Sequence, residues 1–93
     1  MTTSITIDAT DRDTVLLTVI SDGTPVHEEE LERVGAVDNR LLTAIDTLFQ
    51  KNILDRLAPI PVKAGKRVDR TSILYRMILT LDAALERSRA QYS

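Results

Sequence analysis

Few residues of this 93-residue chain have the types and spacing that enzymatic or metal chemistry requires. His27 is the single histidine and cysteine is absent, which excludes multi-histidine and thiolate metal sites within one chain. The carboxylates of 28–30 and of Glu32 could bind a divalent cation, but neighbouring side chains of a strand point in opposite directions. We therefore predict no catalytic residue, no cofactor and no metal site, and interpret the acidic run as a charged edge.

Four of the twelve basic residues form the one basic cluster of the sequence, namely Lys63, Lys66, Arg67 and Arg70. No aromatic residues are interleaved with them, so the cluster is a weak signal for nucleic acid, and a solvated loop is the favoured interpretation over a phosphate or RNA contact. The formal net charge is −2, with both signs mixed along the sequence. We expect no direct nucleic-acid partner and no anionic membrane partner.

The composition predicts one small globular domain over 1–93 with an aliphatic core. Hydrophobic residues make up 43% of the chain, but the aromatic ones are three in number, Phe49, Tyr75 and Tyr92. The longest apolar run spans three residues, 15–17, far short of the roughly 20 that cross a bilayer. Residues 1–4 lack the charged region of a signal peptide, so we expect a cytoplasmic location.

The first third of the sequence predicts a β-meander over 4–33. Residues 4–8 alternate apolar and polar side chains, and 14–20 are β-branched and apolar, which favours two strands of an antiparallel hairpin. A turn signal follows at 21–23. The segment 24–35 is ambiguous, because its glutamates and Thr-Pro start suit a short helix as well as a third, edge strand.

The remaining sequence predicts two helices, 38–52 and 69–90, separated by a strand at 58–64. Asp38 and Asp69 are the expected N-caps. Pro59 and Pro61 remove amide donors from one side of the strand, which makes it an edge strand with its open side blocked. A strand, a helix and a strand in succession imply a parallel pair with a right-handed crossover. The fold class is then α/β or α+β: a small two-layer domain with a mixed sheet of three to four strands and both helices on one face.

Both helices carry apolar arcs of roughly 140°, wider than one packing surface needs. One interpretation gives all of this surface to the core, and the other adds a partner interface. The residues predicted for such an interface are Leu41, Leu42, Ile45, Leu48, Phe49, Leu74, Tyr75, Met77, Ile78, Leu81 and Leu85.

Several short strings resemble one family in their order and spacing. They are Ile5–Thr10, the second strand with its turn at 15–23, the helical string 40–48, and Ile60–Gly65. Together they resemble the N-terminal actin-like subdomain of the bacterial scaffold protein for threonylcarbamoyladenosine tRNA modification, the TsaB or YeaZ type. The resemblance covers most of this chain but about the first half of a usual family member. It implies that 24–33 is a third strand.

The sequence also departs from the family pattern. The family has a Gly-Pro-Gly-Ser-aromatic-Thr-Gly loop before its second helix, whereas this chain keeps the first glycine alone, Gly65. The family's histidine before the first helix is replaced by 37–39. Asp8, Thr10 and Asp11 lie in the hairpin that holds phosphate in active members of the superfamily, but the glycines that admit phosphate are lacking.

The resemblance implies a non-catalytic scaffold subunit that pairs through its two helices with a larger actin-like catalytic subunit or with itself. A second hypothesis is a small stand-alone regulatory or phage-type protein-binding adaptor unrelated to tRNA modification. A third, an enzyme that binds nucleotide on its hairpin, ranks last.

Overall fold

The computed structural model describes residues 2–10, 14–32, 37–55 and 58–92, with the backbone alone for 37–39 and 88–92. Its elements follow in the order β1 (Thr3–Ala9), β2 (Thr14–Ser21), β3 (Thr24–Glu32), α1 (Val37–Gln50), β4 (Val62–Ala64) and α2 (Ile73–Tyr92).

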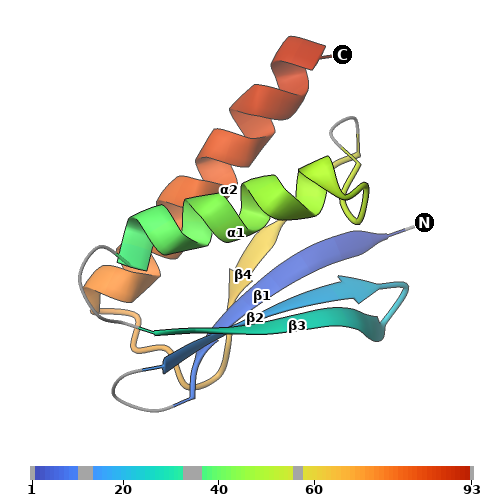
Figure 1. The fold of residues 1–93 in the computed structure, drawn as a ribbon. Helices are drawn as coiled ribbons and strands as arrows, with labels where there is room; N and C mark the ends of the chain where they lie inside the picture. The colour runs from blue at the N-terminus through green and yellow to red at the C-terminus, as the bar shows by residue number, and fades with distance from the viewer. Residues whose placement is uncertain (1, 11–13, 33–36, 56–57, 93) are drawn as a thin grey trace.

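The strands form one mixed sheet in the order β3-β2-β1-β4. The pairs β1–β2 and β2–β3 are antiparallel, and β1–β4 is parallel. Both helices lie on one face of the sheet, and α2 runs beside β4 (Figure 1). The predicted two-layer α/β arrangement is therefore confirmed, with four strands in the sheet.

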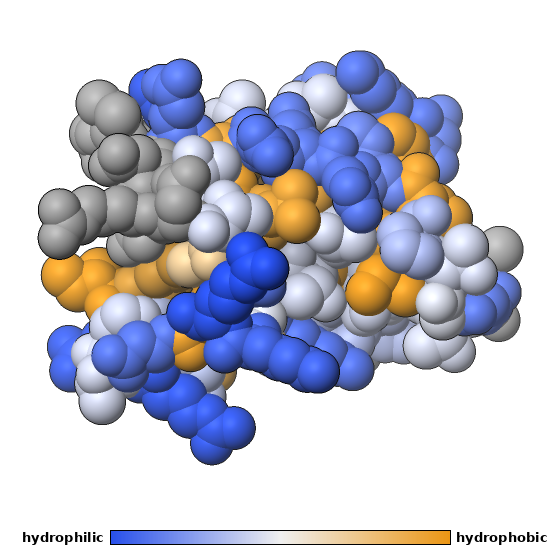
Figure 2. Space-filling view, turned by 90° about the horizontal axis from the view of Figure 1, so that it is seen from below, coloured by the Kyte–Doolittle hydropathy of each residue, from blue (hydrophilic) through white to orange (hydrophobic). Residues whose placement is uncertain are grey.

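The core lies between the sheet and the helices. Alternate residues of β1 and β2 are fully buried there, namely Ile5, Ile7, Val15, Leu17 and Val19. The opposite side of the sheet has no covering layer among the described residues, and Figure 2 shows it as mostly hydrophilic with apolar side chains between the polar ones. Leu16 and Ile20, which pair with Asp8 and Ser4 on that side, are half-buried.

The ambiguous segment forms β3, a strand. Asp22 and Gly23 have φ angles of 52° and 83°, the left-handed values that a type I′ hairpin turn requires at both central residues. The Asp22 side chain also accepts a hydrogen bond from the Thr2 amide at 2.8 Å. This turn returns the chain alongside β2, so the hairpin geometry decides the structure of a segment whose composition is neutral.

Helix α1 ends as the sequence suggests, close to Asn52. Asn52 has a φ of 61°, and the amides of Ile53 and Asn52 donate to the carbonyls of Leu48 and Phe49 respectively. This is a Schellman motif, which satisfies carbonyls left free at a helix end. The proposed cap Asp38 lies within the first turn of α1, and its side chain is outside the described residues.

The start of α2 differs from the prediction. The helix begins at Ile73, and the Ser72 hydroxyl accepts a hydrogen bond from the Tyr75 amide at 3.2 Å, so Ser72 is the N-cap. The Asp69 carboxylate instead accepts from the Thr71 amide at 2.9 Å and from the Thr71 hydroxyl at 2.8 Å. Asp69 thus stabilises a local turn before the helix, because its nearest free donors belong to Thr71.

Strand β4 is an edge strand, as predicted, but the prolines do not block its open side. Pro61 faces inward, since its carbonyl accepts from the Ile5 amide at 2.9 Å, and the Gly65 amide donates inward to Ile7. In a parallel strand the amide and carbonyl of one residue point to the same side, so Val62 and Ala64 face the open edge. The prediction was wrong on this point because the register with β1, not the sequence, decides which residues face outward.

Candidate functional site

Six of the eleven predicted interface residues lie in the core of their own chain. Each is at most 7% exposed, and they are Leu41, Ile45, Leu48, Leu74, Ile78 and Leu81. The apolar arcs are wide because a thin two-layer domain needs these side chains to cover the sheet. This placement corrects the assignment of these six to a partner surface.

The other five predicted residues are accessible to different degrees. Phe49, Tyr75, Met77 and Leu85 are half-buried against the core, and Leu42 is 51% exposed on α1. Two large hydrophobic residues outside the predicted set are also exposed on α2: Leu79 at 52% and Ile73 at 76%. Leu79 and Tyr75 both extend the apolar arc of α2 beyond its core side, but the predicted interface included Tyr75 and left Leu79 out.

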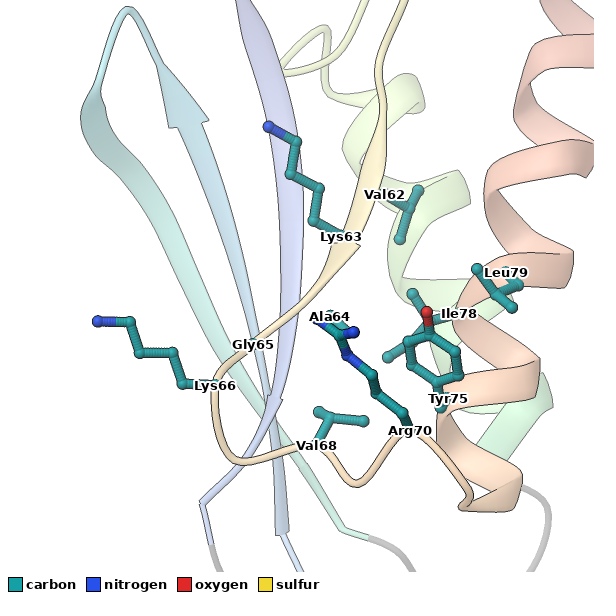
Figure 3. Close-up of a pocket in the computed structure, with 10 residues that line it drawn as sticks. All are labelled: Val62, Lys63, Ala64, Gly65, Lys66, Val68, Arg70, Tyr75, Ile78 and Leu79. Carbon is teal, nitrogen blue, oxygen red and sulfur yellow. The ribbon is translucent and has the colours of Figure 1, made fainter.

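Tyr75 and Leu79 meet at a groove between β4 and α2, which we call the β4–α2 groove (Figure 3). The groove encloses about 430 Å³ and is lined by Val62, Lys63, Ala64, Gly65, Lys66, Val68, Arg70, Tyr75, Ile78 and Leu79. Tyr75 and Leu79 are four residues apart, so they stand on successive turns of α2 and form its apolar wall. The open edge of β4 forms the other side.

The open edge of β4 is half occupied by the protein itself. The amide of Val62 donates to the Asp82 carboxylate at 2.9 Å, and Asp82 extends from α2 to reach it. The amide of Ala64 faces the same edge, and within the part of the chain that the structure describes it has no hydrogen-bond partner. An extended segment laid in the groove can therefore pair with Ala64 directly.

The end of β4 is fixed to β1 by Asp8. Its Oδ1 accepts hydrogen bonds from the Ala9 amide at 2.9 Å and the Arg67 amide at 3.1 Å. The side chain packs on Gly65 so tightly that a Cβ there would lie 2.7 Å from the same oxygen. Asp8 thus holds the loop after β4 against the end of β1, and its carboxylate is committed to main-chain amides of its own chain.

The groove has a positive rim. Lys63, Lys66, Arg67 and Arg70 are all exposed around the end of β4, and Figure 3 shows Lys63 and Lys66 directed away from the groove. Asp69 is the nearest acid in sequence, and the amide and hydroxyl of Thr71 that bond its carboxylate lower its pKa. The combination of main-chain donor, apolar wall and cations suits an extended acidic segment.

The carboxylates of β3 do not converge on one point. Among the described residues, no group of three or more His, Cys, Asp or Glu side chains converges as a metal site. Glu28 and Glu30 point to the open side of the sheet while Glu29 points to the helix side, as their pairing with β2 requires.

Comparison with known proteins adds no assignment: no family model, curated protein or solved structure matches this chain. In the described part of the chain, no helix is long and apolar enough to cross a membrane.

Proposed function

We propose that the chain is a non-catalytic interaction subunit that binds a protein partner at the β4–α2 groove. The observation that carries the proposal is the open Ala64 amide beside an exposed apolar wall, because an unpaired strand edge is a template for an incoming strand. Main-chain pairing supplies affinity in such complexes, and side-chain pockets supply specificity.

The resemblance suggests what the partner is. A scaffold of the tRNA-modification type pairs with a larger actin-like catalytic subunit or with a second copy, and the chemistry then resides in the partner. What supports this proposal is the strand β3, since the resemblance implies a third strand over 24–33. The cytoplasmic location belongs to the same proposal.

Two matched substitutions test the docking surface. Leu79→Asp places a charge on the groove wall, and Leu42→Asp does the same on α1 at an almost equal exposure, 52% against 51%. We expect Leu79→Asp to abolish association measured by light scattering or by co-purification with an actin-like subunit, and Leu42→Asp to leave it intact. Equal loss in both variants would contradict docking at the groove, and co-purification of a larger actin-like protein would separate the scaffold from an unrelated adaptor.

A further inference from the structure

The two outer strands of the sheet carry opposite charge. β3 has three exposed carboxylates, on Glu28, Glu30 and Glu32, and β4 with its following loop has four exposed cations. Both strands have an outer edge without a neighbouring strand among the described residues. Charge of one sign on an edge repels a second copy of the same edge but attracts the opposite one.

We propose that a second copy of this chain seats its β3 along the open edge of β4, so that the sheets of successive copies join head to tail. The inference rests on the proposed function, because it names the occupant of the β4–α2 groove. It also gives the acidic strand β3 a role that the core does not give it.

The register of the sheet places matching charges on the solvent side. Glu28 and Glu30 pair with Thr18 and Leu16, which face away from the helices. Lys63 pairs with Thr6, which faces the same way. When two sheets are joined with their helices on the same side, the carboxylates of one copy therefore stand beside Lys63 of the next.

On the helix side of the sheet, the same register directs two side chains of β3 toward the groove. Glu29 and Leu31 pair with the buried Leu17 and Val15, so they point toward the helix layer and are half-buried. Leu31 packs in part on its own core, and in the joined sheet its exposed part meets the apolar wall of the next copy's groove. Glu29 approaches Arg70 at the rim of that groove. Both faces of β3 are thus complementary to the groove.

Pairing of like edges is disfavoured. Two copies joined β4 to β4 bring their lysines together, and two joined β3 to β3 bring their glutamates together. The favoured contact joins two different surfaces, which makes it heterologous and able to continue into a ring or an open chain. The short β4 limits the main-chain pairing to few bonds, so we expect weak, salt-sensitive association.

Charge reversal tests the pairing directly. We compare three samples by sedimentation velocity. One is a double variant that carries both Glu28→Lys and Glu30→Lys, the second is a double variant that carries both Lys63→Glu and Lys66→Glu, and the third is a one-to-one mixture of these two. Each variant alone opposes like charges, so its association constant should fall at least about tenfold, while the mixture restores association because opposite charges meet again. The matched control, Lys51→Glu with Arg87→Glu, makes the same change of net charge as the lysine variant at exposed sites outside β3 and β4, and it should associate like the wild type.

The outcomes separate this inference from the proposed function. Circular dichroism and urea unfolding of each variant establish that it is folded. Variants that associate like the wild type, or a mixture that gains nothing, overturn β3-to-β4 pairing. If Leu79→Asp still abolishes association in that case, the groove remains the docking site and the second copy uses another surface.

A wild type that stays monomeric up to about 1 mM, well above the dissociation constants of specific complexes, also overturns the inference. The proposed function then depends on the co-purification with an actin-like subunit.

Discussion

The two edges of the sheet are protected against unwanted pairing in different ways. The β3 edge is nine residues long and relies on exposed carboxylates, which repel another copy of itself. The β4 edge is three residues long, and Asp82 of α2 occupies its Val62 amide. The β3 edge thus relies mainly on charge, with a single contact at its end where Arg40 of α1 donates to the Glu32 carbonyl at 3.4 Å. The β4 edge instead has a built contact at Val62 that leaves one amide, that of Ala64, available.

The largest predicted effect on stability comes from a substitution that disturbs the attachment of β4 to β1. Gly65→Ala places a methyl group against the Asp8 side chain, which would have to move away from the Ala9 and Arg67 amides that it now accepts from. We expect the free energy of unfolding in urea to fall by about 3 kcal/mol, as for other overpacked sites. In an Asp8→Gly background the same substitution should cost much less, and an equal cost in both backgrounds would show that the two residues are not coupled.

The Asp82 contact comes next. Asp82→Ala removes the acceptor of the Val62 amide and should lower the free energy of unfolding by about 1–2 kcal/mol. It also frees a second amide at the β4 edge, so self-association should strengthen. Asp82→Asn keeps an acceptor oxygen at the same place and serves as the control. Weaker association of the alanine variant would mean that Asp82 itself contacts the partner.

The β3 edge has its own glycine, which gives a smaller effect. Gly23 has a φ of 83°, and a methyl group added to its Cα would meet no atom within 4 Å. Gly23→Ala therefore suffers from the left-handed backbone and not from crowding. We expect a cost of about 1 kcal/mol in urea unfolding. A loss as large as that of Gly65→Ala would contradict the distinction between a crowded glycine and a conformational one.

The smallest effect concerns acid titration beside the groove. The Asp69 carboxylate has a lowered pKa, first because the Thr71 amide and then because the Thr71 hydroxyl donates to it. A pKa lower in the folded than in the unfolded chain means that this contribution to stability is present above the ordinary value of 3.8 and is lost as the pH falls through the folded value. Thr71→Val removes the hydroxyl, so the pKa measured by NMR should rise toward 3.8. An unchanged pKa would show that the Thr71 hydroxyl does not affect the Asp69 carboxylate.

The sequence predicted the parts of the fold that depend on local pattern. The alternation of β1 and the apolar run of β2 identified both strands, and the turn at Asp22 and Gly23 was visible in its residue types. The residue types did not show whether β3 is a strand or a helix, because glutamates suit a helix or an exposed edge strand equally well. Its partner β2 decides the matter, and pairing between strands is a tertiary interaction.

The candidate site was less predictable. Which residues of β4 face outward depends on the register of Val62 with Ile5, and no local pattern encodes that register. The contact of Asp82 had a signal: an acidic residue beside the apolar arc of α2 needs a partner, and the nearest is an edge amide. The wide apolar arcs led to a wrong interface assignment for six residues, because most side chains of these arcs pack in the core of the chain.

Amide hydrogen exchange at Ala64 distinguishes docking at the β4–α2 groove from docking on another surface. The exchange rate is measured by NMR in the free protein and again as the concentration of the protein or of an actin-like partner is raised. If the β4 edge takes a strand, the Ala64 amide becomes protected and the signals of Tyr75 and Leu79 shift with it. Association in which Ala64 stays unprotected while signals around Leu42 shift would contradict docking at the β4–α2 groove.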